Sequence, residues 1–120
     1  MELGEIIKME RWAIIQSMFL GSDTPVERVV EVFIQGANQN LERIRRGREA
    51  GRRDWCVDAS HSLKSSSANL GLERLSLVSA HLESNAPTMT MSELDQMILI
   101  LSVELGDARG ALLTQLEKNS

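Results

Sequence analysis

His61 is the side chain whose place in the sequence first suggests chemistry. Successive residues of an α-helix lie about 100° apart, and on that spacing the apolar side of the surrounding helix covers an arc of roughly 80°. The residues of this arc are Cys56, Ala59, Leu63, Ser66 and Leu70. His61 lies roughly 180° from the centre of the arc, so we expect the arc to face a core and the imidazole to face solvent.

The outer face around His61 combines small side chains with one nearby ammonium group. Its members are Asp54, Val57, Asp58, Lys64, Ser65 and Ala68. Small residues let the backbone of another protein approach the ring, and Lys64 follows His61 by about one helical turn. A neutral imidazole is a nucleophile, and a nearby lysine offsets the charge of a phosphoryl group. The pattern favours transfer of an anionic group such as phosphoryl over a plain surface histidine.

The elements before His61 are two helix-length segments separated by turn and capping residues. The first, residues 5–20, is apolar on most sides and is followed by Gly21. Residues 24–27 (Thr-Pro-Val-Glu) combine a capping threonine, a proline at the first helical position and a glutamate three residues past the cap. They predict the start of a second helix, which Gly47 and Gly51 bracket at its exit.

Three further helices are expected from His61 onward. Asp54 is a suitable N-cap for the helix that carries His61, and Gly71 should end it. Residues 72–85 carry another apolar stripe, which Asn-Ala-Pro closes. Residues 90–93 repeat the capping signature, and the last apolar stripe continues from there nearly to the end of the chain.

Together these elements predict an all-α fold. No segment alternates apolar and polar residues for the length of a strand, and aromatic residues make up only 3% of the 120 residues. Short connections favour antiparallel neighbours. We therefore expect residues 1–120 to form one domain, an antiparallel up-down four-helix bundle over 24–117 with an additional N-terminal capping helix at 1–22.

Composition excludes several classes of function. The 13 basic and 17 acidic residues give a net charge of −4, which argues against a nucleic-acid partner. One cysteine and two histidines exclude an internal disulfide and the usual four-ligand zinc site. The apolar stretch at 12–22 is too short for membrane insertion. We expect a cytoplasmic protein that holds no metal.

The run His61–Gly71, with the sequence HSLKSSSANLG, closely resembles the signature of histidine-containing phosphotransfer (HPt) domains. Leu75 and the pair Leu82-Glu83 continue the match, whose dense part covers residues 54–83. The resemblance implies a phosphorelay intermediate, which accepts a phosphoryl group from the aspartate of one receiver domain and passes it to another. Such a domain is a phosphocarrier without an ATP site or autokinase activity.

The resemblance also implies roles for individual residues. His61 matches the phosphorylated histidine, which attacks through Nε2, and Lys64 matches the lysine that supports it electrostatically. Ser65 departs from the family, which usually has glycine there. The expected docking surface is Val57, Asp58, Ser65 and Ala68.

The resemblance implies protein partners and no cofactor on this chain. The partners are receiver domains of response regulators and a (hybrid) sensor histidine kinase. The sequence shows no clustered outward carboxylates near His61, and Asp58 alone is a weak ligand, so Mg²⁺ is expected in the acidic pocket of the receiver. A monomer is expected, as is usual for such bundles.

Two other functions stay open at this point. Phosphoacceptor helices of a histidine kinase use an acidic base directly after the histidine, where this chain has Ser62, and they form an obligate dimer. A helical adaptor would use the bundle only for binding and has no need of an exposed imidazole.

Six of the basic residues lie within positions 43–53, all of them arginine. The simplest interpretation is a helix C-terminus whose cations complement the helix dipole. A nucleic-acid patch is a weaker alternative, because the chain is acidic. We also consider modest steering of an acidic partner, which charge reversal at Arg52 and Arg53 would test.

Overall fold

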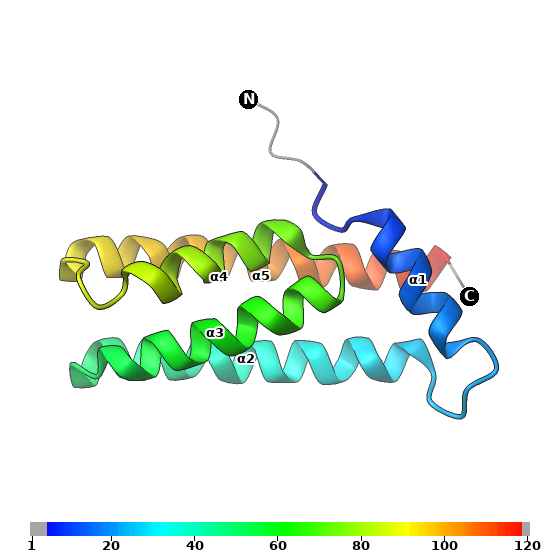
Figure 1. Ribbon diagram of the computed structural model, residues 1–120, viewed down its shortest axis with the longest axis horizontal. Coiled ribbons are helices and arrows are strands. Elements are labelled where there is room, and N and C mark those ends of the chain that lie inside the picture. The colour runs from blue at the N-terminus through cyan, green and yellow to red at the C-terminus, as the bar shows by residue number, and fades with distance from the viewer. Residues whose placement is uncertain (1–4, 119–120) are drawn as a thin grey trace.

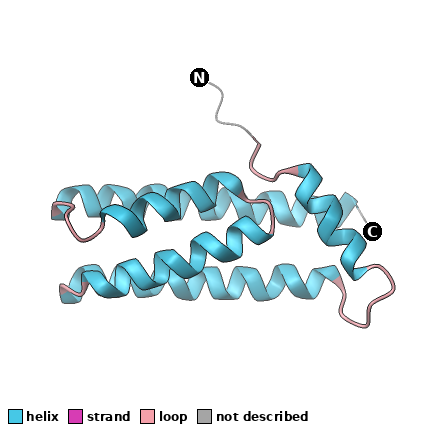
Figure 2. Ribbon diagram, viewed as in Figure 1, coloured by secondary structure: helices cyan, strands magenta, loops and turns pink. Residues whose placement is uncertain are grey.

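The computed structural model describes residues 5–118, within which five α-helices and no strand are found (Figure 1, Figure 2). They are α1 (Met9–Phe19), α2 (Val26–Ala50), α3 (Arg53–Asn69), α4 (Glu73–Asn85) and α5 (Met91–Lys118). The all-α prediction is therefore confirmed. Residues 1–4 of the expected capping segment lie outside the described residues.

Helices α2 to α5 form the expected antiparallel bundle, and α1 crosses one of its ends (Figure 1). Helix α3 packs most extensively on α4 and α2, and α5 closes the bundle against the same two helices. Helix α1 lies at the end where α2 begins and α5 finishes. None of the helices within residues 5–118 has the length and apolar character needed to cross a membrane.

The core follows the predicted apolar stripes with one shift on α3. Cys56, Ala59 and Leu63 are buried as predicted, but Ser66 is only half-buried, and its neighbour Ser67 is fully buried instead. The Ser67 hydroxyl donates a hydrogen bond of 2.6 Å to the Leu63 carbonyl oxygen one turn earlier. Because that bond satisfies the hydroxyl locally, a serine can occupy the tightly packed side of the helix.

The predicted capping signatures have different outcomes. The signature before α5 is confirmed, because the Glu93 N–H donates to Thr90 Oγ1 and the Thr90 N–H donates to Glu93 Oε1, each over 3.1 Å. The signature before α2 is wrong as a capping box. Pro25 takes the N-cap position there, and no side chain caps the helix, while the Thr24 N–H donates to Ser22 Oγ.

The predicted N-cap of α3 is also wrong. The N-cap is Arg52 and the helix begins at Arg53, two residues earlier than expected, so Asp54 falls within the first turn. The Asp54 carboxylate accepts hydrogen bonds of 3.0 and 2.8 Å from the Arg52 guanidinium, and no side chain caps α3. The sequence pattern predicted that the Asp54 carboxylate would cap the backbone N–H groups, but it binds the Arg52 guanidinium instead.

Gly47 does not end α2 but lies buried within it, where the next helix folds back. A Cβ at this position would lie 2.8 Å from the Arg52 carbonyl oxygen and 3.0 Å from Trp55 Cβ. The Arg52 N–H in turn donates a 2.8 Å hydrogen bond to the Gly47 carbonyl oxygen. Gly51, with φ of 68°, is the residue that ends the helix. The α2–α3 turn therefore depends on the missing side chain of Gly47.

We expect Gly47→Ala to lower the free energy of unfolding by about 1–3 kcal/mol, because backbone atoms must move to admit the methyl group. Urea denaturation would measure the loss. The control is Gly106→Ala on α5, where an added Cβ meets no atom within 4 Å. That control should gain up to about 1 kcal/mol of stability from helix propensity. An equal gain at both positions would contradict the packing at Gly47.

Helix α1 is tied to the turn between α3 and α4. The Lys8 N–H donates to the Gly71 carbonyl oxygen over 2.7 Å, and Arg11 Nε donates to the Asn69 carbonyl oxygen over 2.9 Å. Trp12 is buried beneath α1 with only 1% of its surface exposed. Gly71 has φ of 75°, and a Cβ there would lie 2.9 Å from Arg11 Cβ. The capping helix thus braces the turn that joins the two helices of the site described below.

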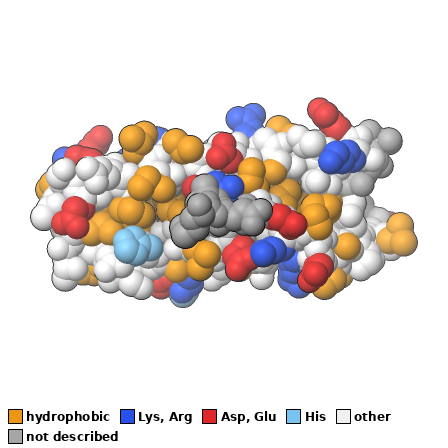
Figure 3. All heavy atoms as spheres, turned by 90° about the horizontal axis from the view of Figure 1, so that it is seen from above, with side chains coloured by type: hydrophobic (Ala, Val, Ile, Leu, Met, Phe, Trp, Pro, Cys, Tyr) orange, Lys and Arg blue, Asp and Glu red, His pale blue; other side chains and the backbone are white. Residues whose placement is uncertain are grey.

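The surface formed by α4 and α5 carries exposed apolar side chains between charged ones (Figure 3). The exposed large apolar residues of these two helices are Leu77, Met91, Leu99, Ile100, Val103 and Leu113. Exposed apolar atoms are common on the surfaces of folded proteins, so this face alone points to no function. The polar side chains that could take part in a reaction lie where α3 packs against α4.

Candidate functional site

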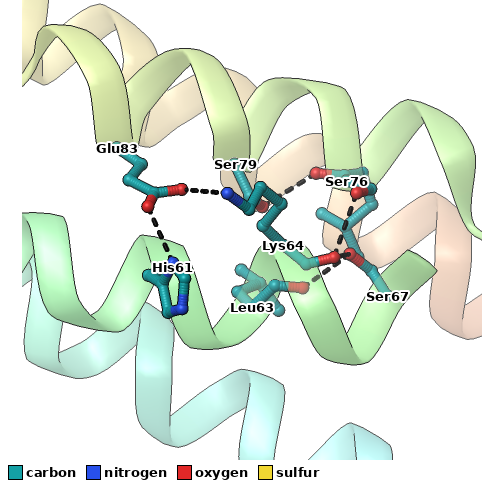
Figure 4. A network of polar contacts seen from close by, with 8 residues as sticks. His61, Leu63, Lys64, Ser67, Ser76, Ser79 and Glu83 are labelled. Atoms are coloured by element: carbon teal, nitrogen blue, oxygen red, sulfur yellow. Dashed lines mark hydrogen bonds and ion pairs between the residues drawn. The ribbon is translucent and has the colours of Figure 1, made fainter. Parts of the chain in front are cut away.

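The site is built on the close packing of α3 against α4. Serines line this interface and leave little side-chain volume between the helices. The fully buried ones are Ser60, Ser67 and Ser79. Ser76 of α4 donates a 3.0 Å hydrogen bond from Oγ to the Lys64 carbonyl oxygen of α3, which joins the two helices directly (Figure 4). This bond fixes how far α4 is displaced along α3.

His61 lies on the outer side of α3, as the helical spacing indicated. Its side chain is 63% exposed, so a partner can reach the imidazole. Lys64, one turn further along α3, is half-exposed with its ammonium group near the same surface. The two residues expected to do chemistry are therefore neighbours on one accessible face.

Glu83 of α4 bridges His61 and Lys64 (Figure 4). Its Oε1 lies 2.7 Å from His61 Nδ1, and its Oε2 lies 2.7 Å from Lys64 Nζ. The hydrogen bond from Lys64, followed by that from His61, lowers the pKa of the Glu83 carboxyl below its usual value. The group is therefore a carboxylate at neutral pH. One of its oxygens binds His61 and the other binds Lys64.

The contact with Glu83 decides which nitrogen of the neutral ring carries the proton. A carboxylate can only accept a hydrogen bond, so the 2.7 Å contact places the proton on Nδ1 of His61. The lone pair of the neutral ring is then on Nε2. Figure 4 shows this second nitrogen on the side of the ring that points away from Glu83. The arrangement provides a nucleophilic nitrogen that faces the surface.

The other residues of the expected docking surface surround this ring on α3. Asp58, Ser65 and Ala68 are exposed, and Val57 is half-buried. Asp58 Oδ2 lies 3.9 Å from a guanidinium nitrogen of Arg43 on α2. The structure thus brings the residues predicted for the site to one face, with low side chains next to the imidazole.

Sequence reasoning missed the role of Glu83. The sequence pointed to Glu83 only as part of the family resemblance, and its contact with His61 was not predicted. A signal was present in the hairpin. Residues at similar distances from the turn lie side by side in two antiparallel helices, and Glu83 follows Gly71 by nearly as many residues as His61 precedes it.

All six arginines at 43–53 have a hydrogen-bond or ion-pair partner within the fold. Arg48 forms two bonds, of 2.6 and 3.0 Å, with the Asp95 carboxylate of α5. Arg53 donates to the Ala86 carbonyl oxygen over 2.6 Å. Arg52 pairs with Asp54 and lies 4.9 Å from the centre of the Trp55 ring. These contacts support the structural interpretation of the cluster.

Comparisons with known proteins agree with this geometry. The family model of the Hpt domain matches residues 28–118. The chain belongs to the Hpt domain family. Hpt domains carry phosphoryl groups on histidine within phosphorelays, and they are phosphocarriers that interact with receiver domains and kinases.

The fold of this Hpt domain also matches a solved structure. The crystal structure of histidine-containing phosphotransfer protein B (HptB) from Pseudomonas aeruginosa PAO1 aligns with a TM-score of 0.84 and covers 98% of each chain. The sequence identity is 18%, so the likeness shows a shared fold. It also extends over α1, which the family model leaves out. No curated protein sequence matches the chain.

Proposed function

We propose that His61 receives the phosphoryl group and that the domain passes it between the aspartates of two receiver domains. The observation that carries this proposal is the exposed imidazole, whose Nδ1 is held by Glu83 while Nε2 faces outward. Nε2 attacks the phosphorus of an aspartyl phosphate, the N–P bond forms, and the P–O bond to the aspartate breaks. The bonding electron pair returns to the aspartate as a carboxylate.

Lys64 supports the transfer electrostatically in this proposal. Its ammonium group lies one turn from His61 and shares Glu83 with the ring. In the transition state of phosphoryl transfer, charge spreads over the phosphoryl oxygens, and a positioned cation lowers the energy of that state. Lys64 thus acts by position and charge, with no bond to the transferred group.

The receiver docks on α3 around the ring in this proposal. Ser65 and Ala68 are small and exposed, so a partner backbone can approach Nε2, and Val57 and Asp58 complete the surface. We place Mg²⁺ in the acidic pocket of the receiver, as the resemblance implies. Because α3 and α4 of one chain supply the whole site, we propose a monomer, and we place it in the cytoplasm with its partners.

A transfer assay tests the proposed function. A receiver domain with radiolabelled aspartyl phosphate is mixed with the chain in the presence of Mg²⁺. We expect a label on this chain that is labile in acid and stable in base, as an N-phosphate is. No label from any receiver would leave the adaptor function, whereas an obligate dimer in solution would indicate the phosphoacceptor helices of a histidine kinase.

Partner steering is best tested at Arg52, since Arg53 bonds to Ala86 and its reversal would disturb the fold. We expect Arg52→Glu to slow transfer by about 2-fold to 5-fold at low ionic strength and to flatten its salt dependence, because charges at an interface rim act mainly on association. Stopped-flow transfer rates over a salt series measure this. Arg28→Glu at the other end of α2 is the matched control. Equal effects at both positions would indicate net charge alone.

A further inference from the structure

Glu83 accepts hydrogen bonds from two residues, His61 and Lys64, and these two contacts have different consequences during transfer. Oε1 accepts a hydrogen bond from His61 Nδ1–H, and Oε2 accepts one from Lys64 Nζ, both over 2.7 Å. The Glu83 side chain is 21% exposed, so surrounding protein limits its movement more than that of the ring. The following inference rests on the proposed role of His61.

The charge on the ring changes when the phosphoryl group arrives. Attack by the Nε2 lone pair forms the N–P bond, and the ring then carries a positive charge while Nδ1 keeps its proton. On release, a carboxylate oxygen of the second receiver attacks phosphorus, and the N–P electron pair returns to Nε2. The leaving group is then neutral imidazole with its proton still on Nδ1, so no proton has to move in either direction.

Loss of the Nδ1 proton from the phosphorylated ring would change this balance. The N–P bond would then have to break toward an imidazolate anion, which is a much poorer leaving group than neutral imidazole. Retention of the Nδ1 proton therefore determines how readily the phosphoryl group is released from His61. A carboxylate in contact with that proton favours the protonated ring, because an opposite charge at short range stabilises the cation.

We propose that Glu83 is a positioning residue that retains the Nδ1 proton on phosphorylated His61 and thereby governs release of the phosphoryl group to the receiver. Glu83 does not touch the phosphoryl group, and it acts through the ring. The ring is hydrogen-bonded to Oε1 and Lys64 to Oε2. Lys64 can therefore turn toward the phosphoryl oxygens while the contact between Oε1 and Nδ1 is kept.

The charged groups around the ring come from three helices. Asp58 and Lys64 lie on α3, Glu83 lies on α4, and Arg43 of α2 lies 3.9 Å from Asp58. Within residues 5–118, the carboxylate hydrogen-bonded to the ring is that of Glu83. Its lowered pKa keeps it charged well below neutral pH, so a change in transfer rate on the alkaline side cannot come from titration of Glu83 itself.

Glu83→Gln tests the proposal, because glutamine keeps the size and an acceptor oxygen but removes the negative charge. Both proteins are phosphorylated, and transfer to a receiver is measured from acidic to alkaline pH. We expect the pH at which transfer begins to slow to move down by about one unit in the variant. Transfer by the variant should then be about 10-fold slower on the alkaline side and nearly unchanged on the acidic side. Glu73→Gln is the control, since Glu73 also lies on α4 and pairs with a lysine, Lys8.

A pH profile of Glu83→Gln parallel to that of the wild type would overturn the proposal and leave Glu83 as a brace between helices. A wild-type chain that takes no label would instead contradict the proposed function. Nitrogen-15 NMR of the wild-type ring needs no variant and remains decisive if Glu83→Gln does not fold. We expect the proton on Nδ1 before phosphorylation and its retention afterwards at neutral pH. A proton on Nε2 of the unphosphorylated ring, or early loss from the phosphorylated one, would refute the proposal.

Discussion

Replacing His61 with glutamine is expected to abolish phosphate labelling, with a fall of more than about 1,000-fold in transfer, because the reacting nucleophile is removed. The lone pair of an amide nitrogen is delocalised into the carbonyl group, so glutamine offers no substitute for Nε2. The imidazole is 63% exposed, and such a surface change should alter stability by no more than about 0.5 kcal/mol. Transfer from a labelled receiver and thermal unfolding would be measured on the same preparation.

The chain supplies its own control in His81, the second histidine. His81 is exposed on α4, and Asn85 Nδ2 donates to its backbone carbonyl oxygen over 2.8 Å. His81→Gln should therefore keep full labelling. If His61→Gln kept the label and His81→Gln lost it, the phosphorylated residue would be His81 on α4 and the proposal for His61 would be wrong.

Lys64→Ala is expected to slow transfer by about 10-fold to 100-fold, because one cation near the phosphoryl oxygens is lost. This expected loss is smaller than that for a hydrogen-bond donor in a site without water, because Lys64 is half-exposed and water screens its charge. Lys64→Arg should recover part of the rate, since it restores the charge with a different shape. Single-turnover transfer would separate these effects from docking.

The stability of Lys64→Ala should stay within about 1 kcal/mol of the wild type, as is usual for partly exposed ion pairs. Lys8→Ala is the matched control, because Lys8 also pairs with a glutamate of α4, Glu73, over 3.1 Å. That control should leave transfer unchanged. A large loss of melting temperature in Lys64→Ala alone would show that the side chain holds α3 to α4 and that the slower transfer is an indirect effect.

Helical periodicity was enough to predict the number and order of the helices, whereas their ends depended on competition among nearby groups. Within residues 5–118, the side chains of Thr90 and Glu93 each bond to the backbone N–H of the other residue, and the capping box forms. Asp54 instead formed an ion pair with the Arg52 guanidinium. Sequence patterns describe these options without ranking them, because the ranking depends on where charged neighbours lie in space.

The site shows the same division between local and tertiary information. Exposure of His61 follows from its position on a single helix, so the helical spacing was sufficient. The role of Glu83 depends on the relative shift of two helices, which Ser76 and buried serines determine. A comparison of helix faces one at a time cannot find such a contact, but alignment of the hairpin about its turn can.

The contact between His61 and Glu83 spans only 22 positions of the chain. Contacts between residues close in sequence form early and rapidly when a chain folds, since little loop entropy is lost. The reactive arrangement is therefore encoded almost entirely in one helical hairpin, and the remaining helices mainly shield its apolar side. Because one hairpin carries His61, Lys64 and Glu83, protein engineers could graft it into an unrelated bundle whose other helices cover its apolar side.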